Sequence, residues 1–385
     1  MSKKKISIVT ATRAEYGILK PLIRRLFAED AWQTRLVVTG THLVKQYGDT
    51  VKEIEADSFP VHKRIPIFES GDTPYAVSRM MANALRGFAE YFEQEKPDLL
   101  IVLGDRTELL AICAAALNER IPIAHLHGGE LTFGAVDDSI RHAVTKMSYL
   151  HFAAAEEYRQ RIIQLGEAPE RVFNVGSLGV ENVLNEEFLD RKQLAGSVGF
   201  PAEGDYALVT FHPATLEGNP RQQIEELCRA MREQKELFFL ITKANADAGG
   251  TQINEYLEQE AEKSPNMKLV ASLGMKRYLS AVKYARFVLG NSSSGIIEVP
   301  SFEIPTVNIG DRQKGRIMAD SIISCKPERR SIQQAMQQAV EMNCSGYKSP
   351  YGDGTTSKQI MGIIRDFLDK EHPDLKKEFY DLPAV

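Results

Sequence analysis

The strongest constraint on the fold is an alternation of strands and helices that runs through the sequence twice. Short, continuous apolar runs are separated by longer segments in which apolar residues recur with helical spacing. Such runs are typical of strands that are buried on both faces of a parallel sheet. The sequence therefore predicts two doubly wound α/β halves. The expected strands span residues 6–10, 36–39, 98–103, 121–126 and 150–154, and then residues 206–211, 237–242, 267–270, 287–289 and 306–309.

The length of 385 residues fits two or three domains of ~150 residues each. A Gly/Ser turn at residues 175–177 ends the first series. We therefore expect an N-terminal Rossmann-like domain over residues 1–174 and a second over residues 175–356, followed by a helix and tail over residues 357–385. Ligands of doubly wound sheets bind at the carboxyl ends of the strands, so a cleft between the two domains is the expected site.

Composition excludes several classes of function. The net charge is −5, so no global basic field points to nucleic acid. No apolar run approaches the ~18 residues that a membrane-spanning helix needs, which predicts no membrane partner. The four cysteines have no CxxC spacing, and we expect reduced thiols in a cytoplasmic protein.

The densest group of polar residues lies in HLHGGELTFGAVDDSIRHAVTK, residues 125–146. Acids, imidazoles and a cation at a crossing from strand to helix are typical of the active edge of an α/β enzyme. His127 and Glu130 flank a Gly-Gly turn and are expected to face the cleft. Asp137 and Arg141 share a helix face; each is a catalytic candidate or, alternatively, a cap and an ion-pair partner. No HExxH spacing is present and HLH lies on a strand, so we expect no metal ion.

Asp105 follows the expected strand over residues 98–103, beside the strand that leads into this segment. Alone, an acid at this position predicts a cap for the helix that follows. With the cluster from the neighbouring strand beside it, Asp105 becomes a candidate general base.

A second set of residues suits an anion. The sequence GNSSSGIIE, residues 290–298, runs from a strand through a Ser/Gly turn into a helix. Hydroxyls and backbone amides at a helix start form a phosphate cradle, although a Ser-capped helix has the same pattern. The first βα loop carries Arg13 but no GxGxxG, which disfavours a dinucleotide. These features predict a nucleotide-sugar. Its diphosphate is expected against the second half, beside the Ser/Gly turn, and its sugar against the first half.

The motifs resemble those of the UDP-N-acetylglucosamine 2-epimerases, specifically the hydrolysing branch of bacterial sialic acid biosynthesis. The likeness runs almost from end to end, through TATRAEYG, VTGTH, VLGDRTE, HLHGGE, DDSIRHAVTK, VGS, FHPAT, GNSSSGIIEVP and NIGDRQKGR. The resemblance implies the glycosyltransferase-B fold, with a C-terminal helix that returns to the first domain. It also implies a cytoplasmic homodimer or homotetramer that needs no cofactor.

The resemblance further implies a reaction in which UDP leaves C1 as the C2 proton is removed. Water then adds to the resulting 2-acetamidoglucal and gives N-acetylmannosamine. By motif, the resemblance also implies a set of residues that hold UDP: Arg13, His212, Asn291, Ser292, Ser293, Ser294, Gly295, Glu298 and Arg312. Among them, His212 and Arg312 would offset charge on the leaving diphosphate. Many relatives read HIEGGE, with a catalytic glutamate where this chain has His127. The base assignment therefore stays open between His127, Asp105 and Asp137.

Two departures from the non-hydrolysing branch favour hydrolysis. That branch has a QHR motif after the second strand and a lysine in the first loop, where this chain reads THL and AEYGI. Three alternatives remain: the same chemistry on UDP-2,4-diacetamido-2,4,6-trideoxyglucose, a glycosyltransferase of the same fold, and a non-catalytic UDP-sugar sensor.

Overall fold

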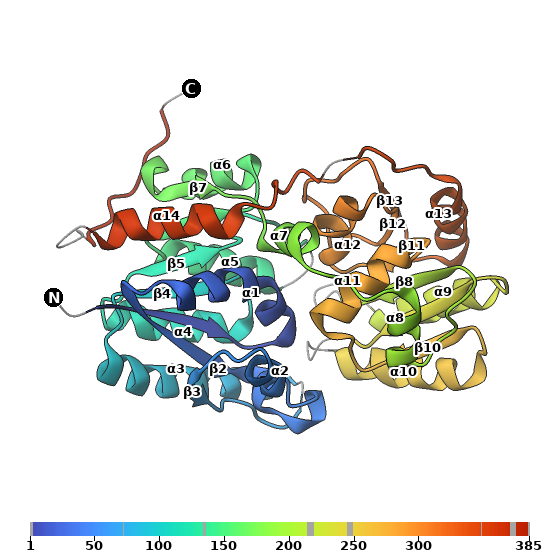
Figure 1. The fold of residues 1–385 in the computed structure, drawn as a ribbon, viewed down its shortest axis with the longest axis horizontal. Coiled ribbons are helices and arrows are strands. Elements are labelled where there is room, and N and C mark those ends of the chain that lie inside the picture. The colour runs from blue at the N-terminus through green and yellow to red at the C-terminus, as the bar shows by residue number, and fades with distance from the viewer. Residues whose placement is uncertain are drawn as a thin grey trace. The chain divides into compact units, whose positions relative to one another are not determined.

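The computed structural model describes residues 3–71, 73–133, 136–213, 219–244, 249–347, 349–369 and 375–383. By their internal contacts the residues form two compact units (Figure 1). The first comprises Met1–Glu130, Asp137–Asn182 and Tyr351–Val385, and the second comprises Leu131–Val136 and Val183–Pro350. The chain thus passes to the second unit between Asn182 and Val183, eight residues beyond the predicted boundary after residue 174.

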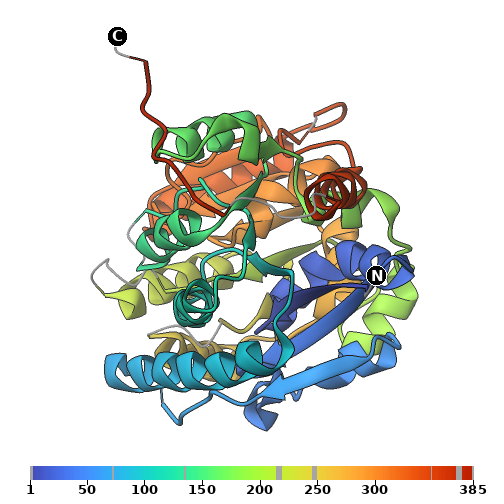
Figure 2. The same ribbon diagram turned by 90° about the vertical axis from the view of Figure 1, so that its left-hand side faces the viewer.

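The first unit contains a parallel sheet of seven strands in the order β3-β2-β1-β4-β5-β6-β7. Side chains along its strands alternate between two cores. In β4, Leu99, Ile101 and Leu103 enter one core, and Leu100 and Val102 enter the other. This explains the continuous apolar run, because both faces of the strand are covered by helices (Figure 2). The strands are β1 (Lys4–Thr10), β2 (Trp32–Thr39), β3 (Val61–Ile65), β4 (Leu99–Leu103), β5 (Ile123–Leu126), β6 (Leu150–Ala153) and β7 (Val172–Asn174).

The helices of this unit begin with recognisable caps where the sequence provides them. Thr12 and Glu15 form a reciprocal capping box at the start of α1, and Thr73 caps α3, which has Pro74 in its first turn. The helices are α1 (Arg13–Ala28), α2 (Val51–Ala56), α3 (Pro74–Glu95), α4 (Thr107–Asn118), α5 (Val136–Met147), α6 (Glu156–Gln164) and α14 (Thr356–Leu368). The unit boundary falls within one further helix, α7 (Leu178–Asn185).

The C-terminal helix α14 packs within the first unit. Its apolar residues Ile360 and Ile364 belong to the same core as Leu22 of α1. Arg25 of α1 donates to the Ser357 hydroxyl at 2.6 Å. The polypeptide therefore returns to its first sheet after the second is complete (Figure 1).

The second unit contains a parallel sheet of six strands in the order β10-β9-β8-β11-β12-β13. It repeats the two-faced burial of the first sheet. Val209 and Leu289 enter one core, and Leu208 and Val288 enter the other. The strands are β8 (Tyr206–Thr210), β9 (Phe238–Thr242), β10 (Met267–Val270), β11 (Phe287–Gly290), β12 (Thr306–Ile309) and β13 (Ile322–Cys325). The helices are α8 (Arg191–Val198), α9 (Pro220–Arg232), α10 (Gly250–Lys263), α11 (Gly274–Tyr284), α12 (Ser294–Ile297) and α13 (Arg329–Glu341).

The two predicted parallel sheets are confirmed, and in both the strand order reverses at the strand that opens the unit. That reversal places the loop after β1 beside the loop after β4, at the position where such sheets bind ligands. Among the described residues, no helix is long and apolar enough to cross a membrane.

Candidate active site

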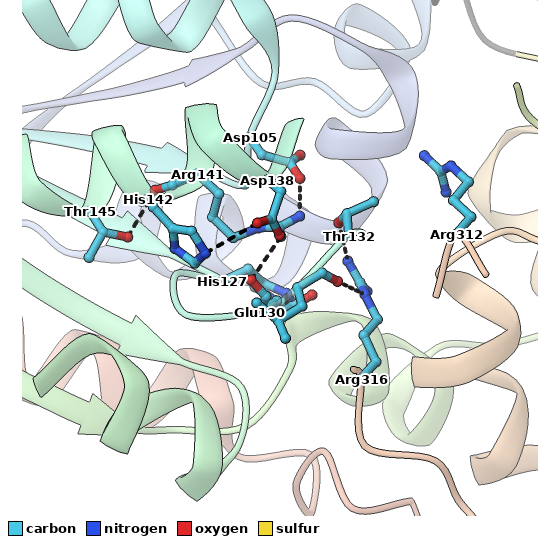
Figure 3. A network of polar contacts seen from close by, with 12 residues as sticks. Asp105, His127, Glu130, Thr132, Asp138, Arg141, His142, Thr145, Arg312 and Arg316 are labelled. Carbon is cyan, nitrogen blue, oxygen red and sulfur yellow. Dashed lines mark hydrogen bonds and ion pairs between the residues drawn. The ribbon is translucent and has the colours of Figure 1, made fainter. Parts of the chain in front are cut away.

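The loops after β4 and β5 bring together polar residues that are far apart in the sequence (Figure 3). Asp105 follows Gly104, whose φ of 79° turns the chain at the end of β4. The Asp105 carboxylate pairs closely with the guanidinium of Arg141, a buried residue of α5. Arg141 also donates to the Glu130 carbonyl at 2.9 Å and lies 3.6 Å from the Asp138 carboxylate. One buried cation thus connects both loops with α5.

His127 and Glu130 form a buried pair directly after β5. The His127 Nδ1 atom lies 2.8 Å from Glu130 Oε1, and Glu130 is 2% exposed. The Nε2 atom is buried and has no hydrogen-bond partner among the described residues. His127 has a φ of 63°, a left-handed conformation that is uncommon for a residue with a side chain. Such strain persists only where surrounding contacts hold it, and it is frequent at functional sites.

The remaining residues of this group lie on α5. Asp137 is half-buried in the first turn of the helix, where carboxylates are favoured. Asp138 lies 3.5 Å from His142 Nε2 one turn later. Burial lowers the pKa of His142 below its usual range, with the Asp138 charge opposing that effect. The i, i+4 spacing on α5 brings Asp138 and His142 together, while Arg141 reaches Asp105 and Glu130.

His125 supports the site from the core. Its Nε2 atom lies 2.7 Å from the Gly104 carbonyl, and its Nδ1 atom lies 3.2 Å from the Thr145 hydroxyl. Burial lowers the pKa of His125 to about 3, so the ring is neutral and donates from Nε2 to the carbonyl. This buried histidine fixes the turn that presents Asp105.

The first βα loop adds Arg13 and a buried acid. Arg13 opens α1, is partly buried, and lies 3.8 Å from Glu53. The Glu15 carboxylate accepts from the backbone amides of Ala11 and Thr12 at 2.8 and 2.9 Å. Burial and the nearby Glu108 charge raise the pKa of Glu15 to about 7. The sequence analysis did not single out Glu15, although its spacing from Thr12 is that of a capping box.

In the second unit, Asn291 links the loop after β8 to the loop after β11. Its side-chain oxygen accepts from the His212 amide at 2.7 Å, and its side-chain nitrogen donates to the His212 carbonyl at 2.8 Å. The preceding Gly290 has a φ of 137°, and a Cβ there would lie 1.9 Å from the Thr210 carbonyl oxygen. Only glycine allows this approach, which explains the GN sequence at the turn.

The Ser/Gly turn continues into the single turn of α12. Ser293 is its N-cap residue, and the Ser294 amide lies 3.4 Å from Ser292 Oγ. Gly295 packs on Thr306, and Glu298 follows the helix as a buried residue. The turn therefore presents hydroxyls and backbone amides at a strand's carboxyl end.

The loop after β12 is tied to the same turn. The Asn291 carbonyl accepts from Gln313 Nε2 at 2.8 Å and from Arg312 Nη1 at 3.2 Å. A guanidinium is thus held beside the Ser/Gly turn, in an arrangement suited to an anion.

The described residues contain no group of three or more His, Cys, Asp or Glu side chains placed to hold a metal ion.

Comparison with known proteins identifies the family of this chain. The sequence model of the UDP-N-acetylglucosamine 2-epimerase family matches residues 24–365. The chain belongs to this family. It is 43% identical over 325 residues to the GDP/UDP-N,N'-diacetylbacillosamine 2-epimerase (hydrolyzing) of Campylobacter jejuni, covering 84% of each protein. It is 37% identical over 386 residues to the polysialic acid biosynthesis protein P7 of Escherichia coli, covering 99% of this chain and 98% of that protein.

The fold matches solved structures of the family. The UDP-GlcNAc 2-epimerase of Neisseria meningitidis, solved with UDP-GlcNAc bound, superposes with a TM-score of 0.79 at 17% identity. The match covers 94% of this chain and all of the other. Two parallel sheets of seven and six strands thus form the glycosyltransferase-B type of fold, as predicted.

Proposed function

We propose that this protein is a hydrolysing 2-epimerase that converts UDP-N-acetylglucosamine and water to N-acetylmannosamine and UDP. In the first step the C1–O bond to UDP breaks and the C2 proton leaves, giving 2-acetamidoglucal. In the second step the oxygen of water adds to C1 and a proton adds to C2 on the opposite face. The proton at C2 is weakly acidic, so the site needs an oriented base and a stabilised leaving group.

The observation that carries the proposal is the buried His127–Glu130 pair beside the Asp105–Arg141 pair. Among the three base candidates, Asp105 already has its carboxylate engaged by the buried Arg141 guanidinium. His127 has one ring nitrogen on Glu130 and its other nitrogen unsatisfied among the described residues. The geometry supports His127 as the base that removes the C2 proton, with Glu130 orienting its ring.

We assign the other candidates to supporting roles. Asp105 and Asp137 remain the acid/base candidates for water addition, and Arg141 fixes Asp105. His212 and Arg312 stabilise charge that grows on the diphosphate as it leaves. The proposed UDP ligands are Arg13, His212, Asn291, Ser292, Ser293, Ser294, Gly295, Glu298 and Arg312.

A second candidate substrate is UDP-N,N'-diacetylbacillosamine, the 2,4-diacetamido sugar. It is favoured by the Campylobacter jejuni relative, whose name specifies that sugar and whose identity to this chain is 43%. The chemistry at C1 and C2 is the same for both sugars, so the proposed roles hold in either case.

Proton NMR of product mixtures in deuterated water tests the reaction and the substrate together. Each UDP-sugar is incubated with the protein, and we expect free sugar of manno configuration with deuterium at C2, together with UDP. Retention of the diphosphate on the epimerised sugar would show a non-hydrolysing epimerase. Transfer to an acceptor without deuterium at C2 would show a glycosyltransferase.

The base assignment is tested with His127→Gln. We expect turnover to fall by roughly 10²–10⁴-fold, the usual contribution of a general base. Because Gln retains a polar side chain but not the base, hydration of added 2-acetamidoglucal should persist better than elimination from the UDP-sugar. Equal loss of both steps would move the base to Asp105 or Asp137.

A further inference from the structure

Three consecutive backbone carbonyls beside the catalytic pair each accept a hydrogen bond from a different arginine. Arg161 donates to Gly129, Arg141 donates to Glu130 at 2.9 Å, and Arg316 donates to Leu131 at 2.9 Å. We call these three bonds the carbonyl clamp. The residues of the carbonyl clamp begin two positions after His127, which has a φ of 63°. The first of them, Gly129, has a φ of 76°. Glycine adopts this conformation freely, but the left-handed conformation of His127 needs external contacts to persist.

Arg141 and Arg161 lie on helices of the first unit, whereas Arg316 lies in the loop after β12, in the second unit. Its Nη2 atom also lies 3.4 Å from the Thr132 hydroxyl (Figure 3). The neighbouring Gly315 packs so closely on Leu131 that a Cβ there would lie 2.6 Å from the leucine Cδ1 atom. These contacts explain why Leu131–Val136 clusters with the second unit.

The same loop holds the proposed diphosphate site. Arg312 and Gln313 donate to the Asn291 carbonyl at the start of the Ser/Gly turn. A path of bonded groups therefore runs from Asn291 through residues 312–316 to the Leu131 carbonyl. Leu131 is joined by a peptide bond to Glu130, whose carboxylate holds the His127 ring.

We propose that Arg316 is a positioning residue that makes the alignment of the His127–Glu130 pair depend on occupancy of the diphosphate site. The inference rests on the proposed function. UDP bound at the Ser/Gly turn restricts the motion of residues 312–316. Through its bonds to Leu131 and Thr132, Arg316 then restricts the motion of the strained backbone at His127. The base is then aligned only while a diphosphate is in place, which restricts proton abstraction to bound substrate.

The first test uses UDP alone as the probe. In the wild-type protein, we expect UDP to slow hydrogen–deuterium exchange of backbone amides in residues 127–133. In Arg316→Ala, UDP should bind with near wild-type affinity by calorimetry, but this protection should be lost. The matched control is Arg286→Ala, because Arg286 also donates to a backbone carbonyl of the second unit, that of Val340, and lies outside the path. It should retain the protection.

Kinetics separates positioning from direct phosphate binding. Arg316→Ala should lower kcat by on the order of 10²-fold, the cost of a misplacement of about 1 Å, with little change in KM. Arg316→Lys should be nearly as impaired, since lysine keeps the charge but cannot span Leu131 and Thr132 with one planar group. Added guanidinium should restore part of the activity of Arg316→Ala. If lysine instead restores full activity, or UDP affinity falls as much as kcat, Arg316 is a phosphate ligand and the proposal is overturned.

A double-mutant cycle tests whether Arg316 acts through the pair. In a Glu130→Gln background, Arg316→Ala should have little further effect on kcat, because the alignment it supports is already lost. Multiplicative losses would contradict the inference. The outcomes also separate the two proposals. No UDP binding and no UDP release by the wild-type protein would contradict the proposed function, whereas intact binding with UDP protection retained in Arg316→Ala contradicts only the coupling.

Discussion

In the first unit the proposed acid/base side chains pair with other side chains, whereas in the second unit the proposed diphosphate site is held by bonds from side chains to the backbone. Asp105 pairs with Arg141, and His127 pairs with Glu130. In the second unit, Asn291 binds both backbone groups of His212, and Gln313 binds the Asn291 carbonyl. In the first unit, the side chains proposed to exchange protons orient one another. In the second unit, the backbone conformation of the Ser/Gly turn forms the proposed ligand site.

This difference predicts different responses to mutation. A side-chain pair fails when either chemical group is removed, even if the shape is kept. A backbone-shaped turn tolerates chemical change at its surface and fails when its conformation is made inaccessible.

The largest expected effect is that of Asp105→Asn. The amide keeps the shape, removes proton exchange and weakens the bond to the buried Arg141 guanidinium. We expect turnover to fall by roughly 10²–10⁴-fold, while UDP affinity measured by calorimetry stays near wild type. Asp98→Asn is the matched control, because Asp98 precedes the same strand at its opposite end and pairs with Lys4 at 3.4 Å. Near-normal turnover in Asp105→Asn would show that the Asp105–Arg141 pair is only structural.

His212→Ala comes next. Asn291 holds the His212 backbone on both sides, so alanine removes the ring and leaves the loop in place. We expect kcat to fall by roughly 10²-fold with a smaller change in KM, because the ring would act on charge that develops in the transition state. Steady-state kinetics on the accepted UDP-sugar measures both constants. An unchanged kcat would reduce His212 to a structural part of the turn.

Gly290→Ala tests the backbone-shaped half directly. The new methyl group would meet the Thr210 carbonyl at 1.9 Å, so the turn must shift. We expect the free energy of unfolding of the second unit to fall by about 1–3 kcal/mol, and UDP affinity to fall with it. Gly310→Ala is the control, because Gly310 has a φ of 73° but nothing within 4 Å of an added Cβ. Denaturant melts should show a smaller loss there; equal losses would mean that close approach is unimportant.

The sequence predicted features that are set by residues close together in the chain better than features that depend on distant residues. The continuous apolar run LLIVL correctly predicted β4 as a buried strand, because its five residues alternate between two cores. By contrast, β3 was missed because VHKRI is a polar edge strand, and β13 was missed because it is only partly buried. The spacing of apolar residues also predicts a single helix over residues 43–55, and this prediction was wrong in its first half. Two short 3-10 turns, Gly40–Leu43 and Lys45–Tyr47, and a left-handed Gly48 precede α2 there.

The candidate residues were predictable from type and position, but their pairing was not. His127 and Glu130 meet because of a positive φ, which no periodicity reveals. Asp105 and Arg141 lie 36 residues apart, and Arg316 lies 185 residues from Leu131. Contacts of that range depend on tertiary packing, so the arginine positions were visible in the sequence while their acceptors were not.

The smallest expected effect concerns Glu15, a buried acid beside the first-unit site that is held by backbone amides. Burial, with the Glu108 charge second, raises its pKa from 4.5 to about 7. A raised pKa in the folded state gives stability that is fully present below pH ~4.5 and is lost as pH rises through about 7. Glu15→Gln removes the charge but keeps an oxygen that can accept from Ala11 and Thr12. We expect the variant to exceed wild type in free energy of unfolding by about 1 kcal/mol at pH 8, since one pKa unit corresponds to ~1.4 kcal/mol and the neutral amide accepts more weakly. Denaturant unfolding at pH 5 and pH 8 measures the gap, which should shrink at the lower pH. A gap that is equal at both values, or reversed at pH 8, would show that Glu15 is ionised without cost and that the backbone amides of Ala11 and Thr12 stabilise its buried carboxylate.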